Sequence, residues 1–343
     1  MYKNRKAIPF VLGVTITLIF ALAVHAQSSY TVGTGGTKGV YYPVGGAIAK
    51  IVDEAKVGIQ LTVESTAGSV FNLKALNSGQ LDIAIAQSDV VDQDFFSNQQ
   101  ASLDDKKLRS VMALYPEPLH LVCSSESGVN SFPDIKGKRI NIGSPGSGQL
   151  NIVRDLLEVY GIEESEFTAQ SLRPSEASDS LRDGNSDCFF YAVGIGSVAI
   201  QDIFTTSDVK IVPLKDPVLD QLIKKFPYYT YTTLPAGTYK GQNAELTLFG
   251  VKALLVTTTE LSEDIVYNIV KSIIGKFDQF KGTHQALKNL TPKAFVEGLG
   301  APLHPGAVRA YQEVGFSFEV NDEIDIKDLE LDNEPERTNQ IDS

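Results

Sequence analysis

The sequence predicts an α/β protein made of two parallel-type α/β lobes, with a ligand cleft at the hinge between them. Apolar, strand-like runs alternate with segments of helical spacing along most of the 343 residues, which is typical of parallel sheets covered by helices. This series starts near Tyr30 and restarts near Lys138. Three strand-to-helix junctions are rich in glycine, serine and threonine, and ligands bind at such edges of open sheets.

The first lobe is predicted from three strands, two of which lead into helices. The strand "YTVGT" is followed by a glycine loop and the helix "YYPVGGAIAKIVDEA", and the strand "IQLTVEST" leads into "VFNLKALNSG". Apolar residues in both helical segments recur at intervals of three or four residues, which favours amphipathic helices. Gly79 is a suitable helix end. A buried strand, "LDIAIAQSD", completes this lobe.

The second lobe repeats the construction after the long apolar run "LRSVMALYPEPLHLVCSS". The strand "KRINIGS" leads through a serine- and glycine-rich loop into the helix "LNIVRDLLEVYG", and "FTAQSL", a helix over "PSEASDSLRDG", "DCFFYAV" and "VKIVPL" follow. The apolar run "ELTLFGVKALLVTT" would return the chain to the first lobe, where helices between about Glu263 and Phe316 would pack. Hinges are expected near 116–120 and 239–247.

The N-terminus is predicted to be a secretory signal peptide. Lys3, Arg5 and Lys6 precede the apolar run "IPFVLGVTITLIFALAV", and a cut is expected before Gln27, which implies a periplasmic location. An uncleaved membrane anchor is the alternative, since the run is nearly long enough to span a bilayer. The predicted organisation has five parts: 1–26 signal peptide, 27–118 first part of lobe 1, 119–240 lobe 2, 241–318 return to lobe 1 with C-terminal helices, and 319–343 acidic disordered tail.

Charge and cysteine content narrow the function classes. Loss of residues 1–26 removes three cations and changes the formal net charge from −12 to −15, which argues against a nucleic-acid partner. Cys123 and Cys188 both lie in strand-like runs, where they could form a disulfide in an oxidising compartment or remain two small buried residues. His120, His284 and His304 are far apart in sequence, so neither a metal site nor a cofactor is expected.

The three junctions, 33–39, 66–69 and 144–149, predict a binding site for a small anion. Glycine allows close approach of the backbone, and each helix start offers unpaired N–H groups with about half a positive charge. Nucleotide binding is disfavoured because the spacing of "GTGGTKG" and "GSPGSG" fits neither a P-loop nor a dinucleotide fingerprint. Tight glycine turns without a ligand are the structural alternative.

Several runs resemble the solute receptors of the TAXI family of TRAP transporters. They are "VGTGGTKGVYYPVGGAIAKIV", "STAGSVFNLKALNSGQLDIAIAQSD", "GSPGSGQLNIVRDLLEVYGI", "SLRDGNSDCFFYAVG" and "HPGAVRAYQEVG", in order from about Tyr30 to Phe318. The resemblance implies a type II-like periplasmic binding protein, expected to be a monomer. It would capture a small carboxylate, a glutamate-like amino acid or a C4–C5 dicarboxylate, and deliver it to an ion-gradient-driven TRAP permease.

The matching motifs indicate which residues of this chain would line the cleft: Thr34, Gly35, Tyr41, Ser69, Asn72, Gln87, Ser144, Ser147, Gly148 and, after the "DCFF" strand, Tyr191. Lys38 and Gln149 are added because they depart from the residues usual in the family and would change the donors beside the ligand. Lys38 is either a solvated loop lysine or a partner for a second carboxylate. Asp89 is expected to accept hydrogen bonds from a nearby loop.

Two other functions compete with the transport receptor. A ligand-presenting accessory protein of a membrane sensor would have the same sequence features. A secreted enzyme is disfavoured, because the cleft loops contain no histidine or cysteine that could complete a nucleophile–base set.

Overall fold

The computed structural model describes residues 28–97, 102 and 105–316. The predicted signal peptide and acidic tail therefore lie outside the described residues. Within the described part, no helix has both the length and the apolar character needed to cross a membrane.

The described residues form a ten-stranded sheet in the order β2-β1-β3-β10-β4-β7-β5-β6, with β8 paired to β4 and β9 paired to β10. The strands are β1 Ser28–Gly33, β2 Ile59–Glu64, β3 Ile83–Gln87, β4 Leu108–Ser124, β5 Arg139–Asn141, β6 Thr168–Gln170, β7 Cys188–Ala192, β8 Val209–Val212, β9 Thr230–Leu234 and β10 Leu246–Thr258. Pairings among β1, β2 and β3 and among β5, β6 and β7 are parallel, whereas β4 and β10 run antiparallel to their neighbours.

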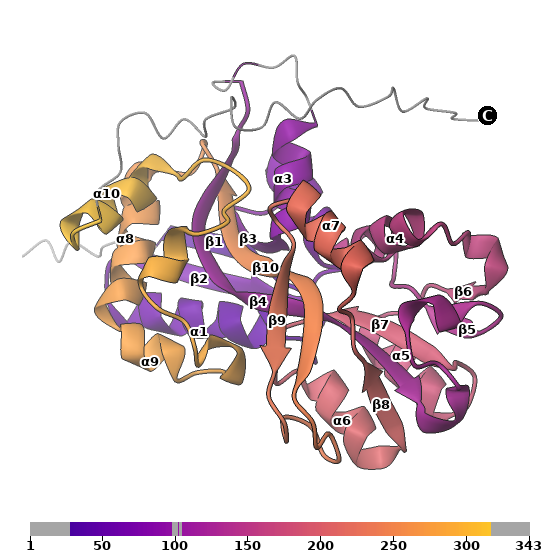
Figure 1. Ribbon diagram of the computed structural model, residues 1–343. Helices are drawn as coiled ribbons and strands as arrows, with labels where there is room; N and C mark the ends of the chain where they lie inside the picture. The colour runs from indigo at the N-terminus through magenta and orange to yellow at the C-terminus, as the bar shows by residue number, and fades with distance from the viewer. Residues whose placement is uncertain (1–27, 98–101, 103–104, 317–343) are drawn as a thin grey trace, which may run out of the picture.

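The helices alternate with the strands as the sequence predicts. They are α1 Tyr41–Glu54, α2 Ser69–Asn77, α3 Ser88–Phe96, α4 Gly148–Tyr160, α5 Pro174–Arg182, α6 Val198–Thr206, α7 Pro217–Lys225, α8 Glu263–Gly275, α9 Phe277–Lys281 and α10 Pro305–Glu313. Of these, α3, α6 and α7, together with β9, are absent from the sequence prediction. We call β1–β3 with α1–α3 and α8–α10 the first lobe, and β5–β8 with α4–α7 the second lobe (Figure 1).

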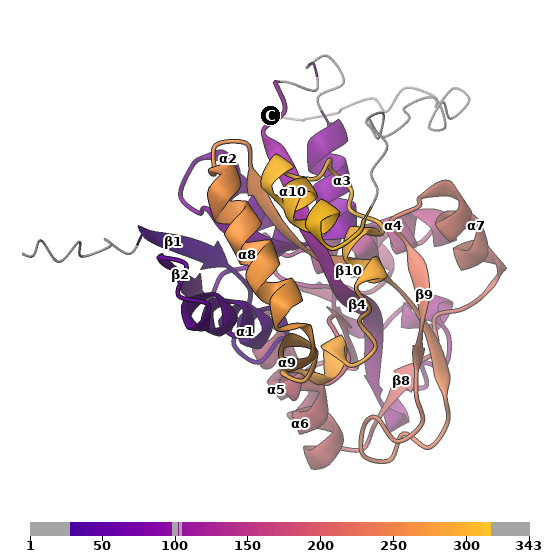
Figure 2. The same ribbon diagram turned by 90° about the vertical axis from the view of Figure 1, so that its left-hand side faces the viewer.

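Both lobes are layered, with helices on the two faces of their sheet. In the first lobe, α1, α8 and α10 contribute to one apolar cluster and α2 and α3 to another, and Figure 2 shows α8 beside α10 on the outer face. In the second lobe, α4 and α7 bury their apolar residues together on one face, while α5 and α6 cover the other. Each sheet is thus buried on both sides, which explains its continuous apolar strands.

Two long strands, β4 and β10, connect the lobes. β4 pairs with β10 from Leu108 to Pro118 and then with β7 from Leu119 to Cys123, so this crossing lies inside the predicted hinge at 116–120. β10 leaves β9 after Gly250 and pairs with β3 from Ala253. The second crossing therefore lies C-terminal to the segment predicted at 239–247. The hinge motion and the lobe limits at 118/119 and 240/241 stay predictions.

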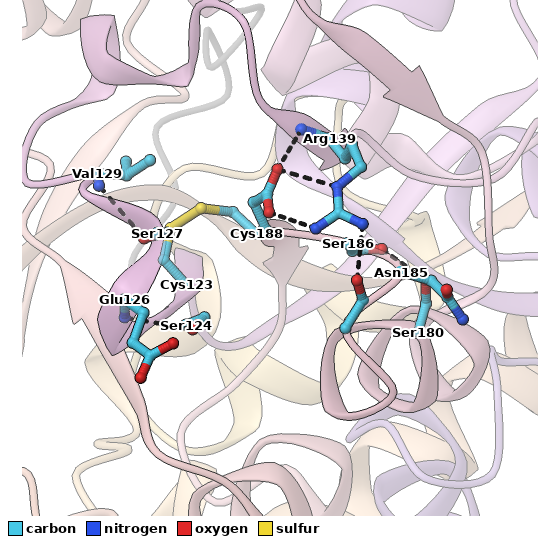
Figure 3. A network of polar contacts seen from close by, with 12 residues as sticks. Cys123, Ser124, Glu126, Ser127, Val129, Arg139, Ser180, Asn185, Ser186 and Cys188 are labelled. Carbon is cyan, nitrogen blue, oxygen red and sulfur yellow. Dashed lines mark hydrogen bonds and ion pairs between the residues drawn. A yellow bond between two sulfur atoms is a disulfide. The ribbon is translucent and has the colours of Figure 1, made fainter.

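A disulfide joins β4 to β7 in the second lobe. Cys123 and Cys188 are directly opposite each other in the strand register, and their sulfur atoms are bonded (Figure 3). The neighbouring Asp187 accepts hydrogen bonds from the backbone N–H and guanidinium of Arg139 on β5. Of the two alternatives for the cysteines, the structure therefore has the disulfide, and both residues are fully buried.

Candidate functional site

A cavity of about 300 Å³ lies between the two lobes, at the lower end of the size range of small-molecule sites. Its wall is built from the loops that follow β1, β2 and β3 in the first lobe and β5, β6 and β7 in the second. Because parallel strands end at the same edge of a sheet, these loops converge although they are far apart in sequence. Ten predicted site residues line the cavity: Gly35, Lys38, Tyr41, Ser69, Gln87, Ser144, Ser147, Gly148, Gln149 and Tyr191.

Two predicted residues, Thr34 and Asn72, lie behind the cavity wall and do not line it. The Asn72 amide donates to the carbonyl oxygens of Thr34 (2.7 Å) and Ile85 (2.8 Å) and accepts from the Thr66 hydroxyl. The Thr34 hydroxyl donates to the carbonyl oxygen of Glu64. Both side chains are fully buried, and their polar atoms are used to tie β1, β2, β3 and α2 together at the loop ends. Their predicted ligand contact is therefore corrected to support of the backbone.

Three long helices start at the cavity wall with unneutralised N-termini. The residues preceding α1, α2 and α4 are Val40, Gly68 and Ser147, and no side chain caps any of these helices. Their first turns contain no acidic residue. Apart from the N–H of Phe71 in α2, which donates to the carbonyl oxygen of Gly146, the first N–H groups and the positive end of each helix dipole are thus available to an anionic ligand from both lobes.

The lobes touch on two sides of this cavity. On one side, the N–H of Phe71 in α2 donates to the carbonyl oxygen of Gly146 (3.1 Å). On the other, the carbonyl oxygen of Lys38 accepts from the Ala199 N–H at the start of α6 and from the Ser197 hydroxyl. These contacts enclose the cavity and describe an arrangement in which the lobes are closed on each other.

Lys38 lines the cavity and forms an ion pair across the lobes. Its ammonium is 3.3 Å from a carboxylate oxygen of Asp202 on α6, and both side chains are about half exposed. Exposed pairs of this kind contribute roughly 0–1 kcal/mol. Lys38 therefore already has a carboxylate partner from the protein, which weakens the hypothesis that it awaits a second carboxylate of the ligand.

Glu117 is a buried carboxylic acid in the cavity wall that the sequence analysis did not select. Its side chain is 2% exposed, and its Oε2 accepts a hydrogen bond of 2.7 Å from the Tyr41 hydroxyl. It has no ion-pair partner among the described residues. Burial raises the pKa of Glu117 to about 8, against the lowering effect of the Tyr41 hydrogen bond.

Gln87 lines the same cavity and has a buried donor that is not used. The side chain is 4% exposed, its Oε1 lies 3.4 Å from the Ser69 hydroxyl, and its Nε2 has no hydrogen-bond partner among the described residues. A buried amide donor without a partner is costly, so a ligand acceptor would satisfy it. The Ser69 hydroxyl also lies 3.3 Å from the Tyr41 hydroxyl, which connects Gln87 to Glu117.

Arg173 is a second lining residue that the sequence analysis missed. It precedes α5, is exposed at the cavity and has no ion-pair partner among residues 28–97, 102 and 105–316. Signals for both missed residues are visible in the sequence. Glu117 stands between two prolines in the apolar run "LYPEPLHL", and Arg173 directly precedes the proline that starts a predicted helix.

The tyrosine pair at 41–42 is divided between cavity and surface. Tyr41 is 9% exposed and lines the cavity, whereas Tyr42 is 36% exposed. Tyr191 from β7 lies against the first glycine loop, because a Cβ on Gly39 would come within 2.7 Å of its hydroxyl oxygen. A side chain at position 39 would therefore push against Tyr191 of the other lobe.

The described cavity residues have the chemistry of a binding site for a small charged molecule. They supply hydroxyls, amides, helix N-termini, two cations and one buried acid, and neither a histidine nor a cysteine is among them. The nearby His120 is fully buried, with Nε2 3.1 Å from the Tyr239 hydroxyl, and burial lowers its pKa to about 4. It therefore packs as a neutral core residue.

Three solved structures illustrate the similarity of the fold to known proteins. A protein of Bordetella bronchiseptica RB50 aligns with a TM-score of 0.51 at 16% identity, over 84% of this chain and 98% of that chain. A structure from work on glutathione import by GshT and the cystine ABC importer TcyBC of Streptococcus mutans aligns with a TM-score of 0.50 at 13% identity, over 76% and 95%. The periplasmic aliphatic sulphonate binding protein SsuA of Escherichia coli gives 0.46 at 14%, over 83% and 82%.

At these identities the structural likeness concerns the fold alone, and it agrees with the two-lobed α/β architecture predicted from the sequence. The sequence itself carries the family assignment, since the model of the NMT1-like family matches residues 32–315, nearly all of the described part. The chain belongs to the NMT1-like family.

Proposed function

We propose that this chain is an extracytoplasmic solute receptor of the TAXI type, which captures a small carboxylate between its lobes and delivers it to an ion-gradient-driven TRAP permease. The ligand would be a glutamate-like amino acid or a four- to five-carbon dicarboxylate, and the receptor would act as a monomer. The similar structure from Streptococcus mutans comes from work on glutathione import through a cystine ABC importer, which agrees with capture of a solute but leaves the type of permease open.

The observation that carries the proposal is the convergence of uncapped helix N-termini from both lobes on one small cavity. A carboxylate placed there would accept hydrogen bonds from α2 in the first lobe and from α4 in the second. Arg173 would contribute a cation at the rim. An anion held from both sides would bind the closed arrangement better than an open one, as ligand-driven closure requires.

The disulfide supports a location outside the cytoplasm. Cys123 and Cys188 are bonded, and such bonds persist in the oxidising periplasm but are rare in the cytoplasm. This agrees with the predicted signal peptide at residues 1–26.

A thermal-shift screen of the purified protein tests the proposal. Amino acids, monocarboxylates and dicarboxylates are added singly, with uncharged sugars and amines of similar size as controls. A ligand of the folded protein raises the midpoint of unfolding by mass action, with about 2.7 kcal/mol of stabilisation at a hundredfold excess over Kd. Failure of every small carboxylate to shift the midpoint, or a shift by an uncharged sugar alone, would contradict the proposed function.

A further inference from the structure

We propose that Glu117 binds the ammonium group of the ligand, so that the cavity selects an α-amino acid over the corresponding acid without an amino group. The inference rests on the proposed function and narrows its ligand class. It starts from three facts: Glu117 lines the cavity, its side chain is almost fully buried, and the described residues provide it with no ion-pair partner.

Among the described residues, no cation is found to act on Glu117. The strand β10 pairs with β4 at Glu117 and carries Lys252, but the Lys252 ammonium donates to the carbonyl oxygen of Glu297. Glu117 faces tyrosines from three elements, Tyr41 of α1, Tyr115 of β4 and Tyr191 of β7, and the acidic Asp89 of α3 also acts on it. The two cations of the cavity, Lys38 and Arg173, are exposed at its rim. A buried carboxylate without a cation stays protonated in an empty cavity, and a ligand cation can complete its pair.

Spacing within the cavity suits the two charged groups of an α-amino acid. The Tyr41 hydroxyl lies 2.7 Å from Glu117 Oε2 and 3.3 Å from the Ser69 hydroxyl oxygen, and Ser69 is the first residue of α2. The Tyr41 hydroxyl therefore lies between Glu117 and the start of α2, where an anion would bind. The ammonium and carboxylate of an α-amino acid are attached to the same carbon atom, so one molecule can reach both.

The cavity thus has a polarity that matches a zwitterion. The ammonium would donate to Glu117, and the carboxylate would accept from the first N–H groups of α2 and α4 and from the unpaired Nε2 of Gln87. A dicarboxylate of the same length would place no cation on Glu117. It would bind only with Glu117 protonated.

The two modes differ in proton balance. Because the pKa of Glu117 in the unliganded cavity is about 8, an arriving ammonium ionises it, and up to one proton is released per ligand near pH 7. A ligand carboxylate that accepts a hydrogen bond from protonated Glu117 releases no proton. In that mode affinity falls as the pH rises through 8, whereas in the ammonium mode it does not.

The test pairs each amino acid with its deaminated analogue. The twenty standard amino acids are screened by thermal shift, and every hit is titrated calorimetrically beside the same acid without the amino group, such as L-glutamate beside glutarate. Titrations in buffers of different ionisation enthalpy count the protons released. We expect the amino acid to bind at least about tenfold more tightly than its analogue, as one charge-assisted hydrogen bond implies, and a fraction of a proton to be released at pH 7.

Variants assign the effect to Glu117. Glu117→Gln keeps the shape and should weaken amino-acid binding about 10- to 100-fold, abolish proton release and leave the analogue unchanged or tighter. The matched control is Glu126→Gln, which removes an exposed carboxylate in the second lobe. Tyr41→Phe, which removes the donor to Glu117, should weaken the amino acid in the same direction, and unfolding curves show that each variant is folded.

The outcomes separate this inference from the proposed function. If glutarate or another deaminated acid binds as well as its amino acid, or Glu117→Gln weakens both equally, the inference is overturned and the carboxylate receptor stands. If no small carboxylate of either class binds to the folded protein, the proposed function fails as well. The inference is supported if an amino acid binds while its deaminated analogue does not, and if this binding is lost in Glu117→Gln but retained in Glu126→Gln.

Discussion

Replacing Gly148 by alanine should disfavour closure of the lobes while the fold remains intact. Gly148 is the first residue of α4 in the second lobe, and its position faces Gln87 of the first lobe. An added Cβ would lie 2.0 Å from Oε1 of Gln87, 2.7 Å from its Cδ and 3.0 Å from Cγ2 of Val90. These distances are shorter than van der Waals contact, so Gln87 would have to move into the cavity.

The size of the effect follows from what opposes this movement. Gln87 is 4% exposed, and overpacking of such sites costs about 1–3 kcal/mol. The cost applies to the closed arrangement alone, because the clash joins atoms of different lobes. Apparent affinity scales with the population of the closed form, so the Kd of any ligand should rise about 5- to 150-fold at 1.4 kcal/mol per factor of ten.

Calorimetric titration and solution scattering test this prediction. Gly46→Ala is the matched control, since Gly46 lies within α1 and nothing lies within 4 Å of its added Cβ. The control should bind normally and gain about 0.5–1 kcal/mol of stability, as alanine does in a helix. Gly148→Ala should remain folded, bind about 5- to 150-fold more weakly and need correspondingly more ligand for the same compaction. Normal affinity together with normal compaction would refute the reasoning about the contact.

Four further predictions concern other groups. Burial raises the pKa of Asp89 to about 8, so the folded protein keeps a proton that the unfolded chain loses above about pH 4, and the free energy of unfolding falls as the pH rises from about 4 to 8. Denaturant unfolding of Asp89→Asn should show a smaller fall over this pH range, and an equal fall in both proteins would contradict the prediction. Lys38→Ala should change the affinity for mono- and dicarboxylates equally and by less than about fivefold, because its partner is Asp202; a selective loss of diacids in calorimetry would restore its predicted pairing with a second carboxylate. Ser147→Leu should abolish binding without unfolding, since the side chain would fill the start of α4, and normal affinity would exclude this helix end from the site. Alanine at both Cys123 and Cys188 should lower the free energy of unfolding by about 2–4 kcal/mol, as expected for a loop of 65 residues, and an unchanged denaturant midpoint would show that the bond contributes little.

Much of the fold could be predicted because its strands and helices have distinct periodicities. Apolar runs such as "LDIAIAQ" and helical segments such as "LNIVRDLLEVY" coincide with β3 and α4. The helix α3 was missed because "SDVVDQDFF" follows β3 without a turn, so the apolar run continues across the boundary. The helix α7 is also absent from the prediction, although the sequence contains a signal for its start: Asp216 caps the helix and Pro217 is its first residue.

For the candidate site, the sequence could predict which loops meet at the cavity, but it could not predict the direction of every side chain. Residues at the helix starts that follow parallel strands, such as Ser69 and Gly148, line the cavity because topology brings the strand ends and the loops after them together. The direction of a single side chain is set by its neighbours, so the amide of Asn72 turned to backbone carbonyls. Glu117 was not predicted because the place where β4 crosses between the lobes depends on its strand partners. Arg173 lies between β6 and α5, and it reaches the cavity only because β6 ends at the same edge as its neighbouring strands.

The buried acids explain why this protein would need a ligand to remain closed. Asp89 is the second residue of α3, which packs on α4 of the other lobe, and neither of its carboxylate oxygens has a side-chain hydrogen-bond partner among the described residues. Asp89 also raises the pKa of Glu117, and burial raises the pKa of Asp89 itself, so closing an empty cavity near neutral pH means keeping protons on both. An ammonium on Glu117 would remove one of these costs, and a carboxylate on the starts of α2 and α4 would join the lobes. A zwitterion would thus favour closure at both ends, whereas a diacid would do so at one.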